Sequence, residues 1–217
     1  LMIVGASLKR GRDEELERLP KPVMISGNSQ YRAFDLGTAS NVWLQHLEIL
    51  DGLAPDGESG GGIHTDGFLG LHAVRVVDCR AGYGGSAAPD GGHGGGVFVG
   101  ANGLLETMFC TIEDNWSGSG APNPMDFSGG RGGDGAGIFV EGGMARISHT
   151  TIVGNLCRDG FDSAALGVPA GRGGSGGGLG VGSSGELHVS NSTITDNEAG
   201  DGAFSPSGVP DSDGGSG

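Results

Sequence analysis

Glycine dominates this chain, with 49 of its 217 residues, and the formal net charge is −14. Collagen is excluded because no strict three-residue glycine period runs through the strand-like segments, and low complexity is excluded by the regular apolar alternation between the glycine clusters. The negative charge would repel nucleic acid and anionic membranes, so no nucleic-acid partner is expected. No apolar run of about eighteen residues is present, so no membrane span is predicted.

The N-terminal segment, residues 1–54, is expected to form the first coils of a stacked β structure. It begins inside an apparent strand, and the stretch DEELERLPKP (13–22) is the one plausible helical turn. Three further strands are predicted from short apolar runs separated by turn residues: VMISGN (23–28), RAFDLG (32–37) and NVWLQHLEILDG (41–52).

From residue 63 onward, a pair of strands recurs with glycine-rich corners between the copies. The first strand of each pair aligns at Ile63, Val97, Ile138 and Leu179. The second strand follows at a nearly constant distance, at Val76, Ile112, Ile152 and Ile194. Because a two-strand unit cannot bury its apolar face alone, we expect successive copies to stack about 4.8 Å apart and enclose a continuous interior.

A polar corner closes each repeat. Asn115, Asn155 and Asn197 occupy equivalent positions and are predicted to stack as a hydrogen-bonded amide ladder, with Cys79 in the same slot of the earlier coil. The residue before this slot forms a second column: Asp51, Asp78, Asp114, Gly154 and Asp196. Neighbouring carboxylates in such a column repel by roughly 3 kcal/mol at an effective dielectric near 20, and by under about 1 kcal/mol in open water. Solvation therefore suffices for an exposed column, whereas a buried one would need a counter-ion.

The three cysteines, Cys79, Cys110 and Cys157, fall at different places in the repeat. They form neither a disulfide framework nor a Cys/His spacing suited to zinc. We expect them to be small buried hydrophobic residues.

These features resemble the right-handed parallel β-helix repeat proteins, in particular the bacterial group related to the polymorphic outer-membrane proteins of chlamydiae. That group combines a GGxI strand with an L-x-I-x-N-S-x-I-x-x-N-x-A strand. GELHVSNSTITDNEA (185–199) matches this pattern closely, ARISHTTIVGN (145–155) well and LLETMFCTIEDN (104–115) loosely. The resemblance covers roughly residues 23–199 and implies an all-β, right-handed parallel β-helix, or solenoid. Because the group is mostly adhesive or structural, it implies an adhesin-like role more than an enzymatic one.

Long glycine-rich loops set this chain apart from that group. Insertions at 117–135, 158–176 and 200–217 follow successive coils, so we expect them along one edge. Two interpretations stand side by side: functional loops on a rigid scaffold, or solvated decoration or a glycine-rich layer that packs against itself.

The aspartates of these loops and corners make calcium the one cofactor worth testing, because carboxylates and glycine carbonyls supply the hard oxygen ligands it takes. The candidate metal ligands are Asp114, Asp134 and Asp196, and Asp134 lies in GGRGGDGAG (129–137), which partly fits a calcium-binding nonapeptide. Diffuse screening by cations is the alternative to an ordered site. No other cofactor is expected.

We expect one β-helix domain over residues 1–217, a piece of a longer polypeptide, with N-terminal coils at 1–54 and glycine-rich repeat coils at 55–217. The predicted function is a non-catalytic, extracellular or cell-surface scaffold, adhesin-like or fibre-forming. The expected partners are other copies or flanking coils of the same chain, which would add to its strand edges, and cell-surface or glycan ligands. The alternative is a carbohydrate-active β-helix enzyme, of polysaccharide lyase or glycoside hydrolase type. It is less favoured because the strand faces carry Glu106, Arg146 and His149 without a cluster of acids.

Overall fold

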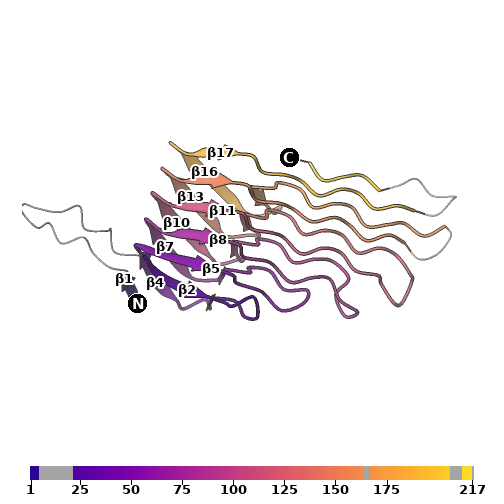
Figure 1. Ribbon diagram of the computed structural model, residues 1–217, viewed down its shortest axis with the longest axis horizontal. Coiled ribbons are helices and arrows are strands. Elements are labelled where there is room, and N and C mark those ends of the chain that lie inside the picture. Colours follow the sequence, from indigo (N-terminus) through magenta and orange to yellow (C-terminus); the bar gives the residue numbers. More distant parts are fainter. Residues whose placement is uncertain (5–21, 164–166, 206–211, 217) are drawn as a thin grey trace, which may run out of the picture.

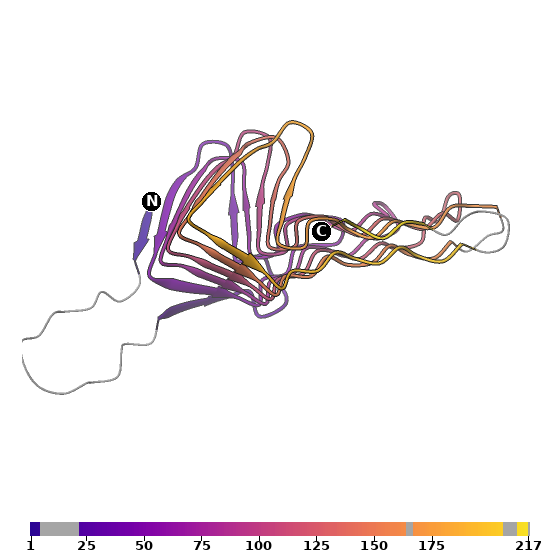
Figure 2. The same ribbon diagram turned by 90° about the horizontal axis from the view of Figure 1, so that it is seen from above.

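The computed structural model describes residues 1–4, 22–163, 167–205 and 212–216, whose strands form an all-β parallel β-helix. Seen from above, the coils trace a triangle with one sheet on each side (Figure 2). The helical turn expected at 13–22 lies outside the described residues, apart from Pro22. Within the described part of the chain, no helix is long and apolar enough to cross a membrane.

Each coil contributes one strand to each of three sheets, which we name A, B and C. Sheet A contains β1 (Met2–Val4), β4 (Asn41–Gln45), β7 (Phe68–His72), β10 (Leu104–Met108), β13 (Met144–Ser148) and β16 (Glu186–Ser190). Sheet B contains β2 (Val23–Ser26), β5 (Leu47–Leu50), β8 (Arg75–Val77), β11 (Thr111–Glu113), β14 (Thr151–Val153) and β17 (Thr193–Thr195). Sheet C contains β3 (Phe34–Leu36), β6 (Ile63–Thr65), β9 (Val97–Val99), β12 (Ile138–Val140) and β15 (Leu179–Val181).

The predicted register is confirmed in sheet C, where Val97 pairs with Ile138 and Ile138 with Leu179. Alternate residues of these strands point into the solenoid, so Val97 and Ile138 are completely buried, as is Leu105 of sheet A. Stacked aliphatic side chains of this kind form one continuous hydrophobic core along the axis. Burial of that core is the main force holding the coils together.

The expectation of two strands per repeat was wrong, since each coil has three. The predicted second strand turns a corner in the middle, at Phe109 and His149, and His46 makes the same corner within the predicted strand 41–52. These residues have φ angles of 57°, 47° and 52°, in the left-handed region. Because non-glycine residues rarely adopt that conformation, nothing in these residue types marked the corner in the sequence.

The long glycine-rich connections that follow β8, β11, β14 and β17 all leave from one edge, at the end of the sheet B strands. They extend side by side away from the coils as a flat projection (Figures 1 and 2). We call this projection the glycine arm; it comprises the described residues of 80–96, 116–137, 156–178 and 198–216, which follow the corners after sheet B. The expected placement of the insertions along one edge is therefore observed.

Candidate functional site

Backbone hydrogen bonds hold the glycine arm together. Each of its loops has a segment that leaves the coils and a segment that returns, and these segments form two stacked layers. In the returning layer, the N–H groups of Gly91 and Gly94, three residues apart, donate to the carbonyls of Arg131 and Asp134 in the next loop. Three residues per turn is the repeat of an extended polyproline-II-like chain. The outgoing layer follows the same period.

A second set of hydrogen bonds joins the two layers. Gly118, in the outgoing layer, donates to Gly92 O of the preceding loop at 2.9 Å, and Gly133 donates to Gly118 O at 2.8 Å. Backbone groups of the arm are thus paired both with the neighbouring loop and with the opposite layer. Of the two interpretations left open by the sequence, the structure supports a glycine-rich layer that packs against itself.

Close approach between loops requires glycine at defined columns. The clearest column contains Gly92, Gly133, Gly174 and Gly215, one from each successive loop. A Cβ added to Gly133 would lie against Gly92 O, and one added to Gly174 against Gly133 O, in both cases well inside the 3.0 Å that real Cβ contacts respect. The repeated Gly-Gly-x pattern of the loops follows from this packing. The three-residue glycine period of the loops is the sequence signal for this packing.

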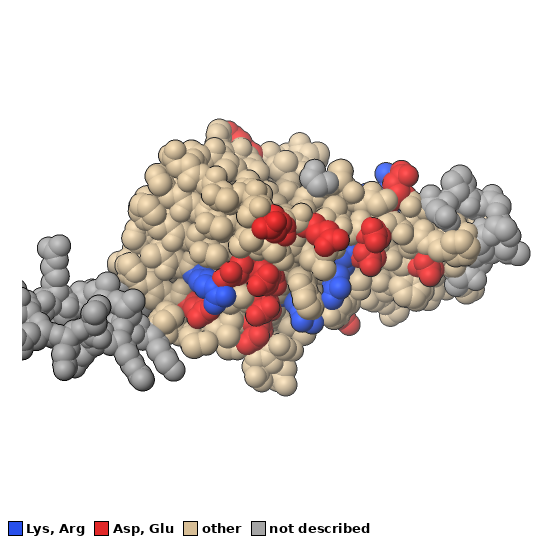
Figure 3. Space-filling model, turned by 45° about the horizontal axis from the view of Figure 1, so that its top comes forward, with Lys and Arg blue, Asp and Glu red and all other residues tan. Residues whose placement is uncertain are grey.

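The third residue of each turn points its side chain outward. On the returning layer these side chains accept hydrogen bonds from the next loop: Asp90 Oδ1 from Arg131 N at 2.7 Å, His93 Nδ1 from Asp134 N at 2.8 Å, and Asp134 Oδ1 from Ser175 N at 2.7 Å. The outward positions therefore carry the polar groups that continue the loop-to-loop bonding. Figure 3 shows acidic residues, with fewer basic ones, on the face of the molecule that it presents, from the coils onto the arm.

The three candidate calcium ligands lie in two different places. Asp114 and Asp196 occupy the corner column two coils apart, with Gly154 between them, whereas Asp134 lies in the arm and accepts the Ser175 N–H. Within the described part of the chain, no group of three His, Cys, Asp or Glu side chains is arranged to hold a metal ion. Calcium binding stays a prediction. Diffuse screening of the acidic arm by cations is a simpler expectation than binding at an ordered site.

Backbone conformation accounts for the aspartate column. Asp51, Asp78, Asp114 and Asp196 all have φ between 51° and 53°, and Gly154, which interrupts the series, has φ of 67°. Asp and Gly are the residue types that tolerate this left-handed corner best. Partial burial raises the pKa of Asp78, and the neighbouring carboxylates Asp114 and Asp51 raise it further. The repulsion expected from the sequence is therefore present, at a mostly exposed corner.

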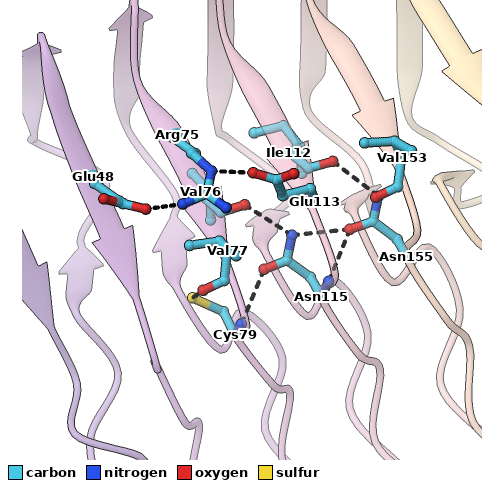
Figure 4. A network of polar contacts seen from close by, with 10 residues as sticks. All are labelled: Glu48, Arg75, Val76, Val77, Cys79, Ile112, Glu113, Asn115, Val153 and Asn155. Atoms are coloured by element: carbon cyan, nitrogen blue, oxygen red, sulfur yellow. Dashed lines mark hydrogen bonds and ion pairs between the residues drawn. The ribbon is translucent and has the colours of Figure 1, made fainter.

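The three asparagines of the next column form a hydrogen-bonded ladder, of which Figure 4 shows Asn115 and Asn155. Asn115 Nδ2 donates to Asn155 Oδ1 at 2.9 Å, and Asn155 Nδ2 donates to Asn197 Oδ1 at 2.8 Å. The same oxygens accept the backbone N–H of the preceding coil's residue, at 3.1 Å for Asn115 N and 3.0 Å for Asn155 N. Each amide thus satisfies buried backbone groups at a corner where no strand can do so.

Cys79 continues the ladder with weaker bonds. Its N–H donates to Asn115 Oδ1 at 3.0 Å, and its Sγ accepts from Gly52 N at 3.4 Å, which is where an amide oxygen would otherwise accept. Burial raises the pKa of the Cys79 thiol to about 12 and that of Cys157 to about 11, and also raises that of Cys110. All three thiols are free and buried, as expected for small core residues.

A charged cluster covers the outer face of sheet B. Arg75 lies between Glu48 of the preceding coil and Glu113 of the following coil, and it is bonded to both carboxylates (Figure 4). Cross-strand pairs of opposite charge stabilise a sheet modestly. Arg75 therefore belongs to the stacking of the coils, and it lies on a different sheet from Glu106 and Arg146.

A groove lies on the outer face of sheet A, with a volume of about 760 Å³. Among the residues described along it, Glu106 is the one carboxylate, and it pairs with Arg146 at 3.3 Å. Trp43, His72 and His188 also line the groove. Sequence reasoning noted several of these residues without placing them together, because their common face depends on where each coil turns.

His93 connects the arm to the coils. Its ring stacks on Phe139 with centroids 4.5 Å apart, while Nδ1 accepts the Asp134 N–H. Burial lowers the pKa of His93; nearby Asp134, Glu141 and Asp90 oppose this effect, and Arg131 adds to it. The folded protein therefore favours the neutral ring.

We expect the stability contributed by His93 to depend on pH. Because its pKa is lower in the folded than in the unfolded protein, this contribution is complete above the unfolded value of about 6.5 and is lost as the pH falls through the folded pKa. Urea unfolding of the wild type and His93→Gln from about pH 7.5 to about pH 5 measures the effect. The advantage of the wild type should shrink towards the acidic end. A constant difference would contradict the assigned role of Nδ1 as an acceptor.

A comparison with known proteins finds no matching family model, no similar curated protein and no similar solved structure.

Proposed function

We propose that the chain is a non-catalytic structural scaffold, extracellular or on a cell surface, whose β-helix holds the glycine arm out as an adhesin-like display. The observation that carries the proposal is the bonding of the arm, in which backbone hydrogen bonds join each loop to its neighbours and to the opposite layer. Loops that clamp around a substrate must open and close, whereas this arrangement favours a fixed shape. Its outward side chains form two ordered faces suited to contact with a partner.

The sequence resemblance to the chlamydial polymorphic outer-membrane protein repeats supports the same proposal, since that group is mostly adhesive or structural. The partners we propose are other copies or further coils of the same chain, joined along the axis, and ligands on cell surfaces. Axial joining rests on the edges of β15, β16 and β17, at which Val181 and Ile194 are about half exposed.

The second candidate is a carbohydrate-active enzyme, which the groove on sheet A favours. A glycoside hydrolase of the common kind needs two carboxylates about 5–9.5 Å apart across the scissile bond. Glu106 is the one carboxylate among the described residues that line the groove, and Arg146 neutralises it. The groove therefore supports binding better than it supports hydrolysis.

Two measurements test the proposal. The purified chain should release no reducing ends or unsaturated products from neutral or acidic polysaccharides, and hydrogen exchange should show the arm amides of Gly118 and Gly133 as protected as those of β10. Turnover of any polysaccharide would overturn the non-catalytic role. Fast exchange throughout the arm would overturn the fixed display.

A further inference from the structure

The groove on sheet A runs along the solenoid axis and crosses several coils. Its walls are two columns of outward-facing side chains, set by the strand register. One column contains Glu106, Arg146 and His188, and the other contains His72, Met108, Ser148 and Ser190. With coils about 4.8 Å apart, the distance from β7 to β16 is roughly 14 Å. The groove thus suits an elongated ligand rather than a single small ring.

Trp43 forms an aromatic platform at one end of the groove. It pairs with Gly70 of the next coil, and a Cβ at Gly70 would clash with the six-membered ring of the indole, so the ring packs directly over the glycine backbone. Phe68 supports it from the side, with ring centroids 5.3 Å apart. Even so, 37 % of Trp43 remains exposed to solvent. An anchored and partly open aromatic ring is a surface on which another ring can stack.

The backbone of sheet A excludes one class of ligand. The strands that the groove crosses from β4 to β13 are each paired with a neighbouring coil on both sides, and β16, at the end of the groove, is paired on one side with β13. An extended peptide bound as an added strand needs free backbone N–H and C=O groups at a sheet edge. Between β4 and β13 the groove therefore offers only side chains, so a ligand lying along it must be recognised through side-chain hydrogen bonds and stacking.

The charge of the groove and of the whole chain excludes a second class of ligand, the polyanions. Glu106 and Arg146 neutralise one another, which leaves the groove with no net cationic wall, and the whole chain carries −14. A polyanion such as nucleic acid or an acidic polysaccharide would be repelled. The remaining polar groups include both donors and acceptors, which suits a neutral ligand rich in hydroxyl groups.

We propose that this groove binds a neutral oligosaccharide that lies along the solenoid axis. One sugar ring stacks on Trp43, and hydroxyl groups of the following units bond to Glu106, Arg146 and Ser148. The inference deepens the proposed adhesin-like function and rests on it, because it names the ligand class for a non-catalytic surface.

The test uses the two tryptophans of the chain, Trp43 and Trp116. In a Trp116→Phe background, Trp43 is the one remaining indole, so its fluorescence reports on the groove. Cellohexaose and chitohexaose serve as neutral probes and hexagalacturonate as an acidic probe, with calorimetry on the unmodified protein as a check. At least one neutral probe should change the emission saturably, and the acidic probe should bind at least about tenfold more weakly.

Two variants locate the site. Trp43→Ala should weaken binding of the neutral probe by about tenfold or more, measured by calorimetry. Gly70→Ala keeps the indole but displaces it from its packing against the backbone of residue 70, and should weaken binding by a similar factor. Tyr83→Ala, a control on the distant arm, should leave binding unchanged. Circular dichroism of each variant serves as the check that it is folded.

Separate outcomes bear on the two proposals. If the folded wild type binds neither neutral probe at millimolar concentration, or if the two groove variants bind as well as the wild type, the groove inference is overturned and the scaffold role stands. Tighter binding of the acidic probe would also overturn it. Cleavage of a bound probe would instead overturn the non-catalytic role and leave the assignment of the groove intact.

Discussion

Replacing Gly133 by alanine should destabilise the glycine arm by about 3 kcal/mol, the upper part of the range for overpacking a close contact. The added Cβ would press on the carbonyl oxygen of Gly92, which belongs to the backbone and is itself hydrogen-bonded to Gly118 N. Relief requires the two loops to separate, and this also breaks the bond from Gly118 N to Gly92 O. Urea unfolding measures the loss of stability, and hydrogen exchange at Gly118 and Gly133 locates it in the arm.

Gly85→Ala provides the matched control. Gly85 also lies in the arm, but a Cβ there would meet only Asp56 Cβ, at an ordinary contact distance of 3.8 Å. Its effect on the free energy of unfolding should stay within about 0.5 kcal/mol. Equal unfolding midpoints for Gly133→Ala and Gly85→Ala would contradict the close packing of the loops.

The second large effect is expected from Asn155→Ala, in the middle of the amide ladder. Asn155 is completely buried, and its side chain accepts from Asn115 N and donates to Ile112 O at 3.0 Å. Removing the amide leaves both backbone groups without their partners inside the solenoid. At about 1–3 kcal/mol for each buried unsatisfied group, we expect a loss of about 4 kcal/mol.

Asn197→Ala tests whether the position within the ladder decides the loss. Asn197 is only partly buried, so water can replace its bonds to Asn155 N and Asn155 Nδ2. Its substitution should cost about 1 kcal/mol, well below the loss for Asn155→Ala. Chemical unfolding of both variants gives the comparison. A loss at Asn155 no greater than that at Asn197 would show that the ladder adds little to the closure of the corner.

Several features of the fold could be predicted because they depend only on residues that recur at the same position of each repeat. Strand pairing needs only that apolar residues alternate and recur at a constant spacing, which places Val97, Ile138 and Leu179 in register. The asparagine ladder follows from the same alignment. An Asn at the same position of successive coils lies within hydrogen-bonding distance of the next one, whatever the details of the coil.

The corner at Phe109 and the architecture of the arm could not be read in this way. The strands before and after Phe109 and His149 belong to different sheets, and this change of direction imposes the left-handed φ at both residues. The residue type therefore does not predict the corner. For the loops, glycine content alone is compatible with mobility or with close packing. The choice depends on whether the carbonyl of one loop meets the glycine of the next, as Gly92 O meets Gly133.

The groove also has one feature that follows from the sequence and another that depends on the tertiary structure. The sequence by itself determined the constant spacing of the repeat, and in the paired strands this spacing brings Glu106, Arg146 and His188 into one column. Only the tertiary structure decided that this column, the His72 column and Trp43 enclose one hollow on sheet A. The three-strand coil sets which residues face outward, and the absence of a side chain at Gly70 lets the indole settle onto the sheet.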